Sequence, residues 1–172
     1  MRRLINWIFL IYFVFTCNGF HLLASENLNL TLQERNWLKS HSVLRLGVDP
    51  AWPPFDFIGD DGQHTGFSAD VLVRISQKIG VKLQLVRNLS WNQVLDKAKK
   101  RELDLISICA QTSERDSYLK YTSAFSVMPW VIATRKNFRE IKELSDLKNN
   151  SVTMVKGYAV IDMTRQKYPQ MK

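Results

Sequence analysis

Hydrophobic and polar positions alternate along this chain in two ways, one typical of strands and one typical of helices. Runs that are apolar throughout, or at every second position, predict strands, whereas apolar residues three and four apart predict amphipathic helices. The predicted strands are 43–48, 82–86, 104–108, 128–134 and 151–155, with a shorter extended segment at 55–58. The predicted helices are 31–41, 68–79, one that begins after Ser90, 112–119, 141–147 and 159–168.

Capping signals support two of these helices. Thr31 with Glu34, and Ser90 with Gln93, have the capping-box spacing, in which the two side chains bond each other's backbone amides. Gly80 follows the helix over 68–79, at the position where a left-handed residue commonly ends a helix. The βαβαβ order of these elements predicts an α/β fold with right-handed crossovers.

The residues directly after the predicted strands are candidates for a binding site. Open parallel sheets bind ligands in the crevice beyond the carboxyl ends of their strands. Asp49 and Trp52 follow the first strand, Trp91 opens the helix after the second, and Thr112 and Arg115 follow the third. Aromatic rings can sandwich a ligand, an aspartate can hold an ammonium group, and an arginine can grip a carboxylate. The pattern therefore predicts a site for a small zwitterion.

Each candidate also has a purely structural interpretation, which the sequence leaves open. Trp91 shares a helix stripe with Val94, so periodicity alone favours a place in the core. Asp49 has the position of a residue that caps a turn. Arg115 is the hardest to explain in this way, because it lies in the first turn of a helix, where the dipole disfavours cations. Cys109 is expected to pack as a small buried hydrophobe.

Composition and charge change this picture little. Of 172 residues, 45% are hydrophobic and 23% are charged, as in ordinary globular proteins. The net charge of +8 is spread along the chain, and its tight cluster at Lys97–Arg101 lies at a predicted helix end, where cations complement the dipole. No basic stripe with interleaved aromatic residues is present, so we expect no binding to nucleic acid.

No pattern in the sequence supports metal, redox or catalytic chemistry. Cys17 and Cys109 are too far apart for a metal knuckle or a redox pair, and His21, His41 and His64 are scattered. No nucleophile and base pair and no phosphate-binding loop is visible. The sequence predicts neither a metal nor a cofactor, and it predicts binding without catalysis.

Residues 1–24 have the pattern of an export signal. Two arginines follow the first Met, an apolar stretch covers residues 4–15, and small residues near the end offer cleavage points. The stretch from Leu4 to Leu23 is also about long enough to span a bilayer as an uncleaved anchor. Either interpretation places the residues after Ser25 outside the cytoplasmic membrane.

Four segments resemble the bacterial solute-binding proteins of the amino-acid type, family 3. They are Asp49–Phe57, which reads DPAWPPFDF, Gly66–Asp70, which reads GFSAD, Asp104–Leu105, and Thr112–Arg115, which reads TSER. The resemblance covers Leu32 to the end of the chain. The segments Leu32–Leu38 and Val155–Val160 look more like the periplasmic sensor domains of hybrid histidine kinases, which use the same fold. The resemblance implies a type II periplasmic-binding-protein clamshell, in which two α/β lobes joined by hinge strands close on a ligand.

The resemblance also implies roles for individual residues in the first lobe. Trp52 matches the aromatic residue that stacks on the ligand, Asp49 matches a nearby acidic contact, and Trp91 matches a second aromatic wall. Arg115 matches the arginine that receives the ligand's α-carboxylate.

Other positions near the expected ligand are Thr112 on the first lobe, and Lys156 and Tyr158 on the second. Lys156 and Tyr158 follow the predicted strand over 151–155, from which they would approach the ligand. The sequence departs from the family pattern at Ala110, two residues before Thr112, where a hydroxyl side chain is common. Ala110 cannot donate the hydrogen bond that this hydroxyl makes.

The resemblance divides the chain into four expected parts. They are a signal or anchor over 1–24, a linker helix over 25–42, a first lobe over 43–134, and a hinge with the start of a second lobe over 135–172. A lobe needs on the order of 100 residues to bury a core. We therefore expect a first lobe that is nearly complete and a second lobe that is only begun, as in a truncated chain.

The expected function is the periplasmic capture of a small polar solute, an amino acid or a related carboxylate. The captured solute would pass to the inner-membrane permease of an ABC-type transporter. The alternative is the ligand-sensing periplasmic domain of a two-component sensor kinase.

Overall fold

A parallel three-stranded sheet forms the centre of the molecule. The computed structural model describes residues 28–147 and 149–169. Strand β1 (Val43–Gly47) lies between β5 (Lys82–Leu85) and β6 (Leu105–Ile106), and both pairs are parallel. Val43 pairs with Lys82, and Leu46 pairs with Leu105. The order with β1 in the middle confirms the predicted α/β fold.

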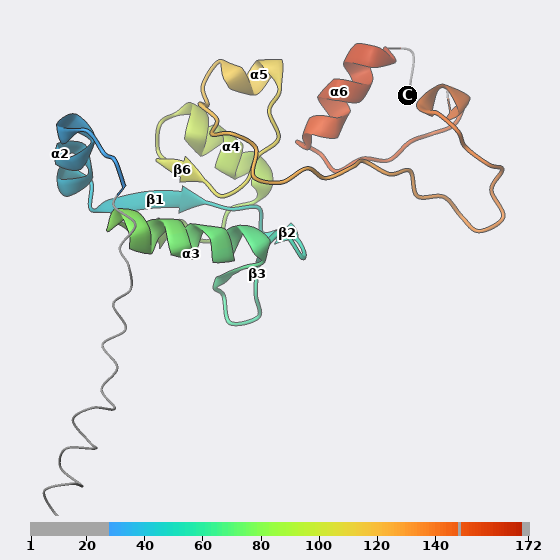
Figure 1. The fold of residues 1–172 in the computed structure, drawn as a ribbon. Helices are drawn as coiled ribbons and strands as arrows, with labels where there is room; N and C mark the ends of the chain where they lie inside the picture. The colour runs from blue at the N-terminus through green and yellow to red at the C-terminus, as the bar shows by residue number, and fades with distance from the viewer. Residues whose placement is uncertain (1–27, 148, 170–172) are drawn as a thin grey trace, which may run out of the picture.

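Two helices cover the opposite faces of this sheet (Figure 1). Leu46 packs in one core cluster with Leu72 of α3 (Phe67–Ile79). Gly47 points to the other face, where a Cβ atom would lie 2.8 Å from Val94 of α4 (Trp91–Lys99). Neighbouring residues of a strand point to opposite faces. The alternation of Leu46 and Gly47 therefore places α3 and α4 on the two sides of β1.

The predicted capping boxes and the predicted helix-ending glycine are confirmed. Helix α2 (Leu32–Ser40) begins with the Thr31 and Glu34 capping box, and α4 begins with the Ser90 and Gln93 box. Gly80 closes α3 with a φ of 72°, in the left-handed region.

A small antiparallel sheet follows β1, in the order β2-β3-β4. It consists of β2 (Ala51–Trp52), β3 (Asp56–Ile58) and β4 (His64–Thr65), with a turn between the last two. The fully buried Asp56 carboxylate accepts hydrogen bonds from the Ser68 hydroxyl of α3 and from the Ser107 hydroxyl after β6, each at 2.6 Å. Asp56 thereby fastens the small sheet to the carboxyl end of the large one.

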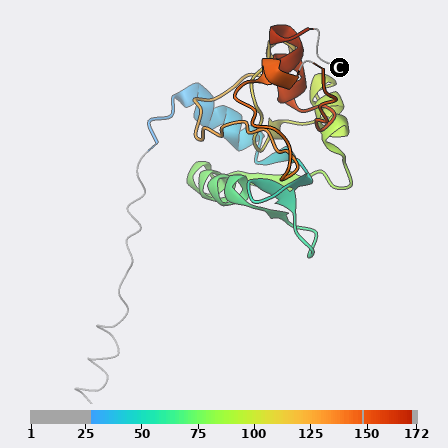
Figure 2. The ribbon, with the colours of Figure 1, turned by 90° about the vertical axis from the view of Figure 1, so that its right-hand side faces the viewer.

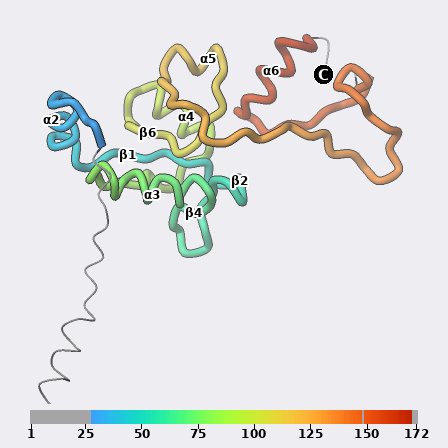
Figure 3. The backbone as a smooth tube through the Cα atoms, viewed as in Figure 1, coloured from blue at the N-terminus to red at the C-terminus, as the bar shows by residue number. Residues whose placement is uncertain are grey.

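The prediction of strands at 128–134 and 151–155 is wrong. Neither segment pairs with another strand in the described chain, and Val131 is 84% exposed. An apolar alternating pattern indicates an extended segment, but a strand forms only when a neighbour supplies its hydrogen bonds. Figure 3 shows both segments, in orange, as parts of a long loop that leads away from the sheet.

Other elements are shorter than their patterns suggested. The strand expected over 104–108 pairs only at Leu105–Ile106, and the helix over 112–119 is the single turn α5 (Ser113–Asp116). The helix expected over 141–147 is a 3₁₀ turn, η1 (Leu144–Leu147). Helix α6 (Ala159–Lys167) forms close to where it was predicted.

Helix α6 and the segment that leads into it lie beyond the carboxyl end of β1. The head of the β1 arrow in Figure 1 marks this end of the strand, and Figure 2 shows the same region from the side.

The expected division into lobes at residues 134 and 135 stays a prediction. Within the described residues, no helix has the length and hydropathy to cross a bilayer. The export signal expected over 1–24 lies outside them.

Candidate functional site

Asp49 lies at the carboxyl end of β1, where it is 3% exposed. Its Oδ1 accepts the Ala51 amide at 2.9 Å, so it caps the turn, as one of the two interpretations of the sequence required. Its Oδ2 accepts the Tyr158 hydroxyl at 2.6 Å. Burial raises the pKa of Tyr158, and the hydrogen bond to Asp49 raises it further. Asp49 therefore both shapes the turn and receives a hydrogen bond from a distant part of the chain.

Asp56 fixes the position of Asp49 through a hydrogen bond to its backbone amide. The Asp49 amide donates to Asp56 Oδ2 at 2.7 Å, and His64 Nε2 lies 2.6 Å from Asp56 Oδ1. Because Asp56 is also bonded to α3 and to the end of β6, the backbone at Asp49 is held from several directions.

Arg115 is 3% exposed, although it belongs to the short helix α5. Nη1 donates to the Ala110 carbonyl at 2.7 Å and lies 3.4 Å from the Cys109 sulfur, and Nη2 donates to the Gly157 carbonyl at 2.8 Å. The guanidinium carbon lies 5.6 Å from the centre of the Trp91 ring, a cation–π contact. Among the described residues, Arg115 has no salt bridge to a carboxylate.

Trp91 is both a core residue and a wall of the site. It packs against the buried cluster that contains Val94, as periodicity indicated. Its indole Nε1 nevertheless points outward and donates to the Gly157 carbonyl at 3.0 Å. Tyr158 stands edge-on to Trp91 at 6.5 Å and edge-on to Trp52 at 6.2 Å between ring centres. The Tyr158 ring thus contacts both tryptophans.

A small cavity remains among these side chains, with a volume of about 40 Å³. Five of the seven predicted site residues line it: Asp49, Trp52, Trp91, Arg115 and Tyr158. The other two do not. Thr112 accepts the Arg115 amide at 3.3 Å as the N-cap of α5, and Lys156 is exposed.

Six further residues were missed as parts of the site: Ile108, Cys109, Ala110, Trp130, Gly157 and Ala159. Cys109 and Ala110 come directly after the third strand, so the rule that selected Asp49 could also have selected them. Gly157 takes part through its carbonyl, which no side-chain pattern reveals.

Burial raises the pKa of the Cys109 thiol, while the nearby Arg115 charge acts in the opposite direction. The thiol is therefore expected to stay protonated and unreactive at neutral pH. No group of three His, Cys, Asp or Glu side chains in the described part of the chain could hold a metal ion.

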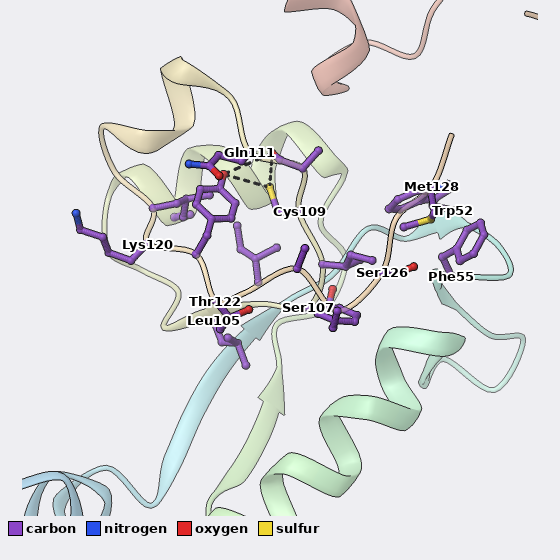
Figure 4. A pocket seen from close by; sticks show the side chains of 18 of the residues that line it. Trp52, Phe55, Leu105, Ser107, Cys109, Gln111, Lys120, Thr122, Ser126 and Met128 are labelled. Atoms are coloured by element: carbon purple, nitrogen blue, oxygen red, sulfur yellow. Dashed lines mark hydrogen bonds between the residues drawn. The ribbon is translucent and has the colours of Figure 1, made fainter. Parts of the chain in front are cut away.

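A second and larger cavity of about 720 Å³ adjoins the first and shares Trp52, Cys109 and Trp130 with it. Its walls come mainly from residues 103–111 and 118–131. In Figure 4, Trp52 and Phe55 lie at one end of this cavity and Lys120 at the other. The cavity therefore extends from the candidate site toward Lys120.

Two curated relatives match most of this chain. The virulence sensor protein BvgS of Bordetella bronchiseptica is 26% identical over 140 residues, which are 81% of this chain and 11% of the relative. The L-cystine-binding protein TcyJ of Escherichia coli is 26% identical over 133 residues, which are 76% of this chain and 50% of the relative. The chain therefore spans half or less of the length of these relatives.

The fold is also similar to a solved structure. The crystal structure of the BvgS periplasmic VFT2 domain of Bordetella pertussis matches with a TM-score of 0.70 and 25% identity, covering 83% of this chain and 60% of that one. This likeness confirms the type II periplasmic-binding-protein fold, and its partial coverage is consistent with one lobe. Residues 44–171 match the sequence profile of one family, so the chain belongs to the bacterial extracellular solute-binding proteins, family 3.

Proposed function

We propose that this chain binds a small zwitterionic solute, an amino acid or a related carboxylate, and performs no chemistry on it. The observation that carries the proposal is Arg115, which is 3% exposed and whose guanidinium donates, in the described part of the chain, to two carbonyl oxygens and a thiol. Burying a guanidinium costs free energy that an anion offsets better than neutral acceptors do. A solute carboxylate supplies that anion.

The other cavity residues suit the rest of such a solute. Asp49 offers a buried carboxylate for an ammonium group, and Trp52 and Trp91 offer aromatic faces that favour cationic or apolar portions. Thr112 acts through Arg115, whose amide it accepts. Membership of a solute-binding family supports binding without catalysis.

The relatives support a periplasmic setting. TcyJ is named for binding L-cystine, and the matched BvgS domain is periplasmic. We place this chain in the periplasm, where it delivers its solute to an inner-membrane permease of an ABC-type transporter. The match to the sensor BvgS over 81% of the chain favours a second candidate, ligand sensing for a two-component kinase. Both rest on the same capture step.

The capture step can be tested by thermal unfolding of the full chain with amino acids, polyamines and small carboxylates. A solute that binds the native state raises Tm. We expect at least one amino acid to raise Tm by several degrees and Arg115→Met to abolish this shift. Arg74→Met, at an exposed arginine of α3, is the matched control and should keep it. The proposal fails if no zwitterion stabilises the wild type, or if Arg115→Met responds as fully as the control.

Transport and sensing differ in the partner that reads the bound state. Co-purification from membranes with a permease supports transport. Co-purification with a membrane-spanning kinase supports sensing.

A further inference from the structure

The groups that would hold the solute are already occupied by the chain itself. We propose that the Gly157–Tyr158 turn is an internal occupant of the solute site, which a solute must displace before it can bind. The inference rests on the proposed function for the identity of the site. The turn is then a competitor within the protein itself, and it weakens the apparent affinity of the site for the solute.

The Gly157 carbonyl takes the place of a carboxylate oxygen. It accepts two hydrogen bonds, from Arg115 Nη2 at 2.8 Å and from Trp91 Nε1 at 3.0 Å. A carbonyl oxygen has two lone pairs, and both are used here. Arg115 and Trp91 both line the cavity, and a solute carboxylate would accept hydrogen bonds from the same two donors.

Tyr158 takes the place of the rest of the solute. Its hydroxyl donates to Asp49 at 2.6 Å, as a solute ammonium would, and its ring contacts both Trp52 and Trp91. The space left over is about 40 Å³, which holds a few water molecules and is too small for an amino acid. An amino acid therefore cannot enter while Tyr158 stays in place.

The turn is shaped for this close approach. Tyr158 donates its amide to the Val155 carbonyl at 3.1 Å, and Gly157 has a φ of 82°, which other residues rarely adopt. A Cβ atom at Gly157 would collide with Asn92 Oδ1. Only glycine brings this carbonyl between Trp91 and Arg115 without displacing a neighbour.

The occupation of the solute site by the Gly157–Tyr158 turn can be tested without knowing the solute. The probe is p-cresol, which is the Tyr158 side chain as a free molecule. Tyr158→Ala in the full chain removes the ring that contacts Trp52 and Trp91 and leaves its space empty. Tyr168→Ala, near the end of α6, is the matched control. We expect p-cresol to bind Tyr158→Ala at least about tenfold more tightly than the wild type or the control. It should also shift the indole NMR signals of Trp52 and Trp91. Equal binding to all three proteins would overturn the inference.

A measurement on the wild type covers the case in which Tyr158→Ala does not fold. The Trp91 indole N–H is bonded to the Gly157 carbonyl, whereas Trp37 is 48% exposed. We expect the Trp91 indole proton to exchange with solvent at least about tenfold more slowly than that of Trp37. Equal exchange rates would mean that the Gly157–Tyr158 turn does not occupy the site, and they would overturn the inference.

Failure of this inference can be told apart from failure of the proposed function. If an amino acid binds the wild type and Tyr158→Ala with equal affinity, the turn is no competitor, but the solute site stands. If p-cresol binds Tyr158→Ala and no amino acid binds any variant, the proposal that the turn occupies the site stands, but the proposal of a zwitterionic solute fails.

Discussion

Asp56 is a single side chain that joins the four segments around the candidate site. It accepts hydrogen bonds from the Asp49 amide and the Ser68 and Ser107 hydroxyls, and it contacts His64. A buried carboxylate is tolerated only when its oxygens are fully bonded, and these partners meet that requirement. The energetic role of Asp56 is therefore to hold Asp49 in place at the end of β1.

We predict that Asp56→Asn lowers the free energy of unfolding by about 2–4 kcal/mol, because an amide nitrogen would replace an oxygen that faces donors. Urea unfolding of the full chain measures this loss. Asp60→Asn, at an exposed aspartate of the same hairpin, is the control and should change stability by less than about 0.5 kcal/mol. Equal effects of the two substitutions would show that the Asp56 network contributes little.

At this scale the sequence indicated which side chains lie together, but not which backbone groups lie with them. Asp49, Trp52, Trp91 and Arg115 meet because the ends of parallel strands meet, which is a property of the fold. Gly157 could not be found in this way, because its carbonyl is chemically the same as every other carbonyl in the chain. Tyr158 was expected to touch a solute, and in the structure it contacts Asp49 directly.

Among the secondary-structure elements, the close packing of α4 on β1 depends on a residue without a side chain. A Cβ atom at Gly47 would lie 2.6 Å from Leu103 Cδ1 and 2.8 Å from Val94 Cγ1. Val94 is fully buried, so it has little room to move. Gly47 therefore sets the distance between the strand and the helix that carries Trp91.

We expect Gly47→Ala to destabilise the protein by about 1–3 kcal/mol through overpacking. Gly80→Ala adds the same methyl group where no atom lies within 4 Å, so only its left-handed backbone is strained. That control should cost about 1 kcal/mol. Thermal or urea unfolding compares the two, and a smaller loss for Gly47→Ala than for Gly80→Ala would contradict the packing argument.

Three helices that the sequence predicted correctly carry local signals at their ends. Capping boxes and a helix-ending glycine mark α2, α3 and α4, and these helices form where they were expected. The segments 128–134 and 151–155 have the hydrophobicity of strands but no partner strand in the described chain. Strand pairing depends on distant residues, so local patterns could not reveal its absence.

For the molecule as a whole, the site is formed where two distant parts of the chain meet. Asp49, Trp91 and Arg115 belong to the segments around the parallel sheet, whereas Gly157 and Tyr158 precede α6, beyond the end of β1 (Figure 1). A clamshell protein binds its ligand between two such parts.

The central claim is that this site recognises a carboxylate and an ammonium group together. The most direct test is calorimetric titration of the full chain with the amino acid that gives the largest thermal shift, with its carboxamide and with its deaminated acid. Arg115 should make the carboxamide bind at least about tenfold more weakly, and Asp49 should do the same for the deaminated acid. Equal dissociation constants for all three would contradict the account.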